Sequence, residues 1–192
     1  MLDEIPLSTL FGVLVLLIFV SAFFSGSETG LLSINRYRLK HLKNEGIPGA
    51  VRASKLLERP DRLIGIILLG NNFVNILASA IATIIAIRLW GESGIMVATM
   101  LLTVVILLFA EVAPKTVAAL HPEKLAFPAS IILGPLLKLF YPIVWFINIV
   151  ANSLLKVIGI KTDNVSSHVL SRDELRTVVD EAGVNIPLSH QK

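Results

Sequence analysis

The stretch FFSGSETG, residues 23–30, joins a long apolar segment to a group of polar side chains. From Ile5 to Phe24 the chain is almost uniformly apolar, and then two serines, a glycine and the ionisable Glu28 follow without a turn signal. Apolar runs of this length are typical of membrane-spanning helices, in which a carboxylate is costly unless it has a partner. The stretch therefore predicts a transmembrane helix that carries a partnered carboxylate.

The composition of the whole chain also favours a membrane protein. Of its 192 residues 54% are hydrophobic and only 16% are charged, and the mean hydropathy is +0.77. These values lie far from those of an average soluble domain. The chain contains no cysteine, which excludes disulfides, thiolate metal sites and cysteine nucleophiles.

Three long uncharged stretches, 5–27, 63–87 and 93–110, predict the membrane-spanning helices. The first two are long enough to cross a hydrocarbon core of about 30 Å, and the third is nearly so. The first stretch is not typical of a cleaved signal peptide, because Asp3 and Glu4 are acidic where a signal peptide is basic. We predict an all-α membrane protein with three transmembrane helices, at about 5–28, 63–87 and 94–119, and amphipathic juxtamembrane helices, at about 36–60 and 124–160, that form a belt on the cytoplasmic side.

The connection between the first two spans is strongly basic. It contains three acidic residues and eight basic ones, which are Arg36, Arg38, Lys40, Lys43, Arg52, Lys55, Arg59 and Arg62. By the positive-inside rule this connection is cytoplasmic, which places the N-terminus outside and the C-terminus in the cytoplasm. A basic run without a base-reading motif in a membrane chain indicates contact with membrane lipids and not with nucleic acid.

The segment from Leu125 to Ile160 is apolar enough to cross the membrane, but Lys138 lies near its centre. It also contains three prolines at seven-residue intervals, the first being Pro128, and each removes a helix hydrogen bond. We therefore favour broken helices along the cytoplasmic leaflet over a fourth span. Residues 1–160 are then the transmembrane domain.

Residues 161–192 are expected to begin a cytosolic helical region. The sequence SRDELRTVVDEAG in this region predicts an amphipathic helix that opens with a capping box from Ser171 to Glu174. The sequence ends soon afterwards without another apolar core, so we expect a further cytosolic domain to follow in a longer protein.

Polar side chains interrupt each of the three spans. In the first span, Ser21, Ser25 and Glu28 lie at i, i+4 and i+7, on one helical face. In the second, GNNFVNILAS (70–79) supplies Asn71, Asn72 and Asn75, and in the third, FAEVAPKT (109–116) supplies Glu111, three residues before Pro114.

The three polar groups lie at a similar predicted depth. Glu28 lies eight residues before Arg36 and Gly70 lies eight residues after Arg62, which is about 12 Å along a helix in each case. Glu111 lies ten residues before the histidine that follows its span, or about 15 Å, provided that the helix continues past its proline. Antiparallel packing would therefore bring the polar groups of all three spans together.

Carboxylate, hydroxyl, amide and backbone oxygens suit hard cations such as Mg²⁺, Ca²⁺ or Na⁺. Gly26 and Gly70 would allow local unwinding, and Pro114 would free the carbonyl of Ala110, as in the broken helices of transporters. Two carboxylates at one depth should repel each other unless a cation lies between them. The alternative is that these groups only pack helices together, with Glu28 or Glu111 paired to Lys115.

The stretches FFSGSETGLLSINRYRL, GNNFVNILAS and FAEVAPKT, in this order and spacing, resemble the transmembrane domain of the CorB/CorC and cyclin M (CNNM) family of magnesium transport proteins, most of all its bacterial CorB branch. The resemblance covers roughly residues 5–160. It implies a homodimer with three spans per protomer and a juxtamembrane belt, in a bacterial inner membrane. It also implies cytosolic CBS domains that bind ATP–Mg²⁺. Because these domains are not among the 192 residues, ATP regulation is not expected of this stretch of chain.

The resemblance further implies a Mg²⁺ site between the spans. Carried over by motif, the candidate ligands are Ser25, Ser27 and Glu28 from the first span, the Gly70 carbonyl and Asn72 or Asn75 from the second, and Glu111 from the third.

The expected function is Mg²⁺ transport by alternating access. The resemblance alone suggests that Mg²⁺ leaves the cell as Na⁺ enters as the counter-ion. The alternative is a regulatory membrane protein that senses Mg²⁺ without moving it. We do not expect an enzyme, because no nucleophile and base accompany Glu28 and Glu111.

Overall fold

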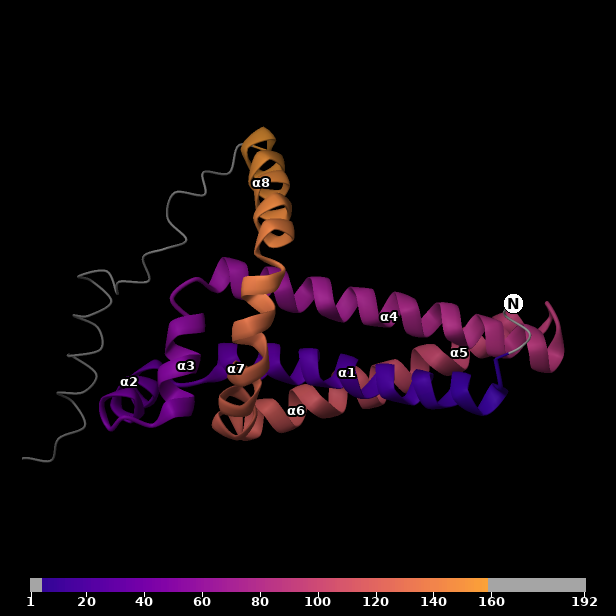
Figure 1. Ribbon diagram of the computed structural model, residues 1–192, viewed down its shortest axis with the longest axis horizontal. Helices are drawn as coiled ribbons and strands as arrows, with labels where there is room; N and C mark the ends of the chain where they lie inside the picture. The colour runs from indigo at the N-terminus through magenta and orange to yellow at the C-terminus, as the bar shows by residue number, and fades with distance from the viewer. Residues whose placement is uncertain (1–4, 159–192) are drawn as a thin grey trace, which may run out of the picture. The chain divides into compact units, whose positions relative to one another are not determined.

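The computed structural model describes residues 5–158, and within this range the chain forms helices joined by short connections, without a β-strand (Figure 1). The helix predicted around Ser171 lies outside the described residues. The elements are α1 (Leu7–Ser33), α2 (Arg36–Asn44), α3 (Pro48–Leu56), α4 (Pro60–Trp90), α5 (Gly94–Val105), the π-helix η2 (Ile106–Val112), α6 (Ala113–Leu120), α7 (Pro122–Leu139) and α8 (Tyr141–Val157). The compact unit discussed below ends at Ala151.

Three of these helices are long and apolar enough to cross a membrane. They are α1 with 27 residues, α4 with 31 residues, and the continuous run of α5, η2 and α6 with 27 residues. At 1.5 Å per residue each is about 40 Å long or longer, so each extends beyond a hydrocarbon core of about 30 Å. The predicted all-α membrane fold with three spans is confirmed.

The three spans lie side by side, with α1 packed against both of the others (Figure 1). A short turn joins α4 to α5, and Gly91 begins it with φ of 68°, a left-handed conformation that favours glycine. The N–H of Gly91 donates to the carbonyl of Ile87 at 2.9 Å. At the same end of the molecule, Nη1 of Arg88 donates to the carbonyl of Ile5 at 2.6 Å and so ties α4 to the start of α1.

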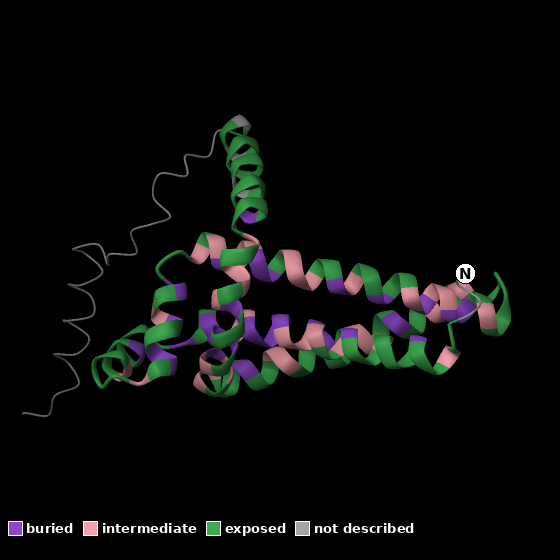
Figure 2. Cartoon of the chain, in the orientation of Figure 1, coloured by how far each residue is buried: buried purple, intermediate pink, exposed green. Residues whose placement is uncertain are grey.

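The core runs along the seam between α1 and α4 and continues into α3 and α7 (Figure 2). Gly70 of α4 lies against the ring of Phe24 of α1, and a Cβ at Gly70 would lie only 2.4 Å from Cζ of that ring. The opposite faces of the spans carry exposed apolar side chains such as Phe19 and Ile76. Such outward apolar faces suit a lipid environment.

The juxtamembrane helix α7 packs against the end of α1 that carries Glu28, near Gly30. Gly49 of α3 lies against Phe127 of α7, where an added Cβ would come within 2.6 Å of the Phe127 Cβ. An ion pair joins Arg38 of α2 to Glu123 of α7. The helices α2 and α3 pack against each other, α3 packs against α7, and α7 packs against α1.

The prolines of α7 do not break it in the way the sequence suggested. Pro128 and Pro135 both lie inside the continuous helix Pro122–Leu139, and the break comes at Phe140, before Pro142. Beyond this break the chain turns by 77° into α8. By length and composition the bent pair qualifies as a broken span or a re-entrant segment, so its position in the membrane stays a prediction.

Candidate cation site

Glu111 joins the three spans through side-chain hydrogen bonds. The hydroxyl of Ser25 on α1 donates to Oε2 of Glu111 at 3.0 Å. The amide Nδ2 of Asn71 on α4 donates to Oε1 of the same carboxylate at 2.9 Å. Ser25 is fully buried and 22% of the Glu111 side chain is exposed. The carboxylate therefore has a polar partner on each of the two neighbouring spans.

Three oxygen atoms converge next to this carboxylate. Oγ of Ser21 lies 2.8 Å from Oδ1 of Asn71 and 2.7 Å from Oδ1 of Asn75. Because a hydroxyl has one proton, Ser21 donates to only one of these oxygens at a time. We call Ser21, Ser25, Asn71, Asn75 and Glu111 the Glu111 cluster. Its surplus of oxygen acceptors is the kind of environment that suits a hard cation.

The backbone of the third span is locally widened at Glu111. Residues Ile106–Val112 form a π-helix, in which the N–H of Ala113 donates to the carbonyl of Leu108, five residues earlier. Pro114 follows directly, and a proline has no N–H to give to the preceding turn. The π-helix lets the span continue through the proline as one helix from Gly94 to Leu120. Single π-helical turns of this kind are frequent at functional sites.

Lys115 binds the same carboxylate from one turn further along. Its Nζ lies 2.6 Å from Oε2 of Glu111, and 44% of the lysine side chain is exposed. The Glu28 carboxylate also acts electrostatically on this ammonium group. The ion pair considered as an alternative explanation for Glu111 is therefore present, and Glu28 lies within electrostatic range of it.

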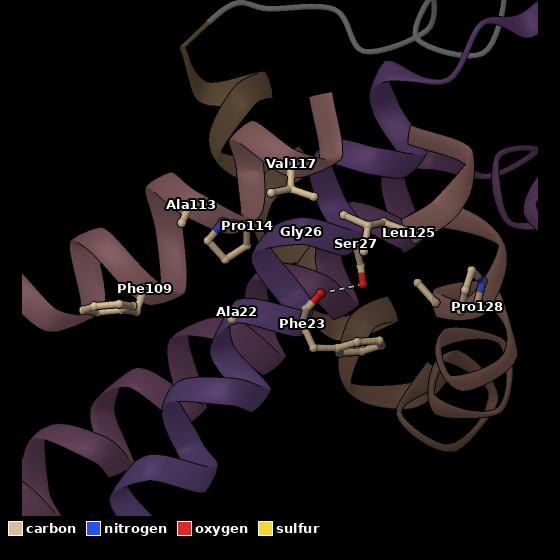
Figure 3. A pocket seen from close by; sticks show the side chains of 11 residues that line it. Ala22, Phe23, Gly26, Ser27, Phe109, Ala113, Pro114, Val117, Leu125 and Pro128 are labelled. Carbon is tan, nitrogen blue, oxygen red and sulfur yellow. Dashed lines mark hydrogen bonds between the residues drawn. The ribbon is translucent and has the colours of Figure 1, made fainter. Parts of the chain in front are cut away.

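Ser27 lies apart from the Glu111 cluster, along an apolar cleft of about 330 Å³ (Figure 3). Its hydroxyl donates to the carbonyl of Phe23 in its own helix, at 2.5 Å. Pro114, Leu125 and Pro128 line the other sides of the cleft. Ser25 and Ser27 are two residues apart and thus about 200° apart around the helix, which separates their surroundings.

The other candidate ligands have varied positions. Asn75 belongs to the Glu111 cluster, whereas Asn72 is exposed. Gly70 and Gly26 lie inside continuous α-helices, so the local unwinding that the sequence suggested is absent at both glycines. Gly70 instead makes room for Phe24. Whether any of these residues binds a metal stays a prediction.

Sequence reasoning placed Ser21 and Asn71 in the polar groups and named Lys115 as a possible partner of Glu111, but it selected none of the three as a site residue. Spacing offered a signal for the first two, because Ser21 lies four residues before Ser25, and Asn71 lies four residues before Asn75. Among the described residues, no three acidic, histidine or cysteine side chains gather at one place. A cation held by the Glu111 cluster would depend on its one carboxylate together with neutral oxygens, as Mg²⁺ sites that retain several waters do.

We predict that Ser25→Ala and Ser27→Ala differ in their effect on Mg²⁺ binding. Ser25→Ala removes a hydroxyl that contacts Glu111 and should weaken binding several-fold, whereas Ser27→Ala removes one bonded within its own helix and should leave the affinity within about twofold. Calorimetric titration of the purified variants with Mg²⁺ would measure the affinity of each variant. Equal losses in the two variants would show that Ser27 contributes as a ligand.

Comparison with known proteins places this sequence in a family. A family model described as the cyclin M transmembrane N-terminal domain matches residues 12–185. The chain is 55% identical over 186 residues to a UPF0053 protein of Haemophilus influenzae, covering 97% of this chain and 44% of that protein. It is 53% identical over 172 residues to the UPF0053 inner membrane protein YfjD of Escherichia coli, covering 90% and 40%.

A more distant relative carries a functional name. The chain is 31% identical over 187 residues to the polyamine export protein of Haemophilus influenzae, covering 89% of this chain and 43% of that protein. The chain thus spans less than half the length of these relatives. Because the family model matches most of the chain and two relatives exceed 50% identity, the chain belongs to the cyclin M transmembrane-domain family.

Proposed function

We propose that this chain forms the ion-translocating domain of a magnesium transporter that works by alternating access, exporting Mg²⁺ as Na⁺ enters. The observation that carries the proposal is Glu111, whose carboxylate contacts Ser25 of α1 and Asn71 of α4. A single ion bound there would contact all three spans at once. Its binding and release would then favour different packing of those spans, as alternating access requires.

The donor set supports a hard cation as the cargo. The Glu111 cluster offers one carboxylate, two serine hydroxyls and two amides, and the chain has no cysteine. Mg²⁺ is usually held by one or two carboxylates and retains several waters, which fits a site with few charged ligands. Direction and coupling to Na⁺ rest only on the resemblance to the CorB/CorC branch.

An organic polycation is a second candidate cargo. The group bound to Glu111 is itself a primary alkylammonium, the ε-amino group of Lys115. A polyamine ends in the same chemical group, and two relatives, at 31% and 30% identity, are named polyamine export proteins. A Mg²⁺ sensor that binds the ion without moving it is the remaining alternative.

The proposed setting follows the family. We infer a homodimer in a bacterial inner membrane, in line with the name of the Escherichia coli relative. ATP–Mg²⁺ would act through CBS domains outside these 192 residues.

Transport by the protein in sealed vesicles tests the proposal. With a Mg²⁺ indicator inside, added Mg²⁺ should enter vesicles containing the wild type. Glu111→Gln should abolish this flux, whereas Thr103→Val should preserve it, since the Thr103 hydroxyl bonds only within its own helix in the structure. Uptake of radiolabelled spermidine into parallel vesicles would test the second candidate cargo, a polyamine. Binding without flux of either would indicate a sensor.

We predict that a tag in the turn at 91–94 is labelled from outside the cell, whereas a reporter fused after Lys161 is cytoplasmic. The reason is the eight-cation connection between α1 and α4, which the positive-inside rule assigns to the cytoplasm. Impermeant thiol reagents suit the first assay, because the chain has no native cysteine. An external C-terminal reporter would mean that the segment containing α7 and α8 crosses the membrane.

A further inference from the structure

Both oxygens of the Glu111 carboxylate already have hydrogen-bonding partners. Oε1 accepts from Nδ2 of Asn71 at 2.9 Å. Oε2 accepts from the hydroxyl of Ser25 at 3.0 Å and lies 2.6 Å from Nζ of Lys115. A cargo cation that uses this carboxylate must therefore share or replace these partners.

The three partners differ in how they would respond to an incoming cation. A serine hydroxyl can turn its proton away and present a lone pair, and an asparagine carries an acceptor oxygen beside its donor nitrogen. An ammonium group has three donors, no acceptor and a full positive charge, so it cannot join a metal ligand set. Of the three partners, Lys115 alone must leave.

We propose that Lys115 is a tethered competitor of the cargo: its ammonium neutralises Glu111 when the site is empty and moves away when a cation binds. This inference rests on the proposed function of the Glu111 cluster. Without a counter-charge, the empty site would hold an unpaired carboxylate inside the membrane, which is costly. The lysine supplies that charge from within the chain and so allows the cargo to be released.

The surroundings of Lys115 allow this movement. Its side chain is 44% exposed, and a flexible four-carbon stem carries the ammonium group, so the side chain can reorient without disturbing the core. Glu28 already acts on the ammonium electrostatically from α1. The released lysine therefore has a second carboxylate nearby, which lowers the energetic cost of giving up Glu111.

The proposal predicts opposite effects for two substitutions of Lys115. Lys115→Met removes the competitor and should tighten Mg²⁺ binding by about tenfold or more, within the usual range of coupling between competing ligands. Lys115→Arg provides a cation that can bind a carboxylate through two hydrogen bonds, so it should weaken Mg²⁺ binding. Lys138→Met, which removes the same charge from an exposed position of α7, should leave the affinity unchanged.

Calorimetric titration of the purified protein with Mg²⁺ would give these affinities, and vesicle flux would be measured on the same samples. We expect Lys115→Met to bind more tightly but to transport more slowly, because release loses its competitor. Unchanged or weaker binding by Lys115→Met would overturn the proposal. If Glu111→Gln still abolished binding in that case, the proposed function would stand. If the wild type bound no Mg²⁺, both would fail.

Amine labelling of the wild type provides a test that does not depend on a substitution. Reductive methylation followed by peptide mass spectrometry would report the reactivity of each lysine with and without Mg²⁺. Mg²⁺ should raise the labelling of Lys115 several-fold and leave that of Lys138 unchanged. Unchanged or reduced labelling of Lys115 at saturating Mg²⁺ would show that the ion pair persists, and the proposal would be wrong.

Discussion

Glu111→Gln is expected to abolish both Mg²⁺ transport and the rise in melting temperature that Mg²⁺ produces in the wild type. Glu111 is the one carboxylate of the Glu111 cluster, and it accepts bonds from Ser25 and Asn71. Glutamine keeps the size of the side chain but removes the negative charge on which a dication depends. At saturating Mg²⁺ the wild type should gain stability by mass action, and the variant should gain almost none.

The melting temperature without Mg²⁺ separates this role from a structural one. If Glu111 serves only to pair with Lys115, the variant should lose stability in the absence of metal, since a cation is left without its partner. If it serves as a ligand, the metal-free melting temperature should change less than the metal-induced shift, because the half-exposed Lys115 has Glu28 nearby.

Thermal unfolding in detergent with and without Mg²⁺ would make this comparison. Glu92→Gln is the matched control, because it makes the same chemical change in the exposed turn between α4 and α5. This control should keep the full Mg²⁺-dependent shift. A full shift in Glu111→Gln as well would mean that the Glu111 cluster is not the binding site.

Gly70→Ala is expected to destabilise the protein strongly for so small a change. The added methyl group would lie 2.4 Å from Cζ of Phe24, a buried ring that also packs edge-on against Phe23. Overpacking of this kind typically costs about 1–3 kcal/mol. The gain in helix propensity from glycine to alanine is at most about 1 kcal/mol, so the clash should dominate.

Gly12→Ala is the matched control for this prediction. A Cβ at Gly12 meets nothing within 4 Å, so only the favourable propensity remains and stability should stay equal or rise. Phe24→Leu in the Gly70→Ala background should recover part of the loss, because the shorter side chain gives the methyl group room. Equal stability of Gly70→Ala and the wild type would show that the seam between α1 and α4 can relax.

Much of the architecture was accessible from the sequence. The three spans follow from apolar runs long enough to cross a bilayer, which is a local property of each segment. The common depth of the polar groups also follows from residue counting, and the contacts of Glu111 with Ser25 and Asn71 agree with it. Antiparallel helices that are anchored at the same membrane boundary can shift little along their axes, so residues at equal distances from that boundary lie at a similar depth.

The rotation of each helix about its axis was decided only by the tertiary structure. Neighbouring residues of an α-helix point about 100° apart, so Asn71 contacts Glu111 while Asn72 is exposed. The spans are almost uniformly hydrophobic, so no amphipathic face indicates which of the two asparagines points towards the neighbouring helices. The choice comes instead from packing, above all from the ring of Phe24 against Gly70.

The backbone of the third span and the partner of its carboxylate were likewise decided in three dimensions. Pro114 indicated an irregularity, but whether a kink, a break or a π-helix results depends on what packs against the span. The position of Lys115 allowed a pair with either Glu28 or Glu111, and in the structure its ammonium pairs with Glu111, four residues earlier on the same span. The sequence alone thus determined which segments span the membrane and at what depth their polar groups lie, whereas the interlocking of side chains between helices decided which of those groups meet.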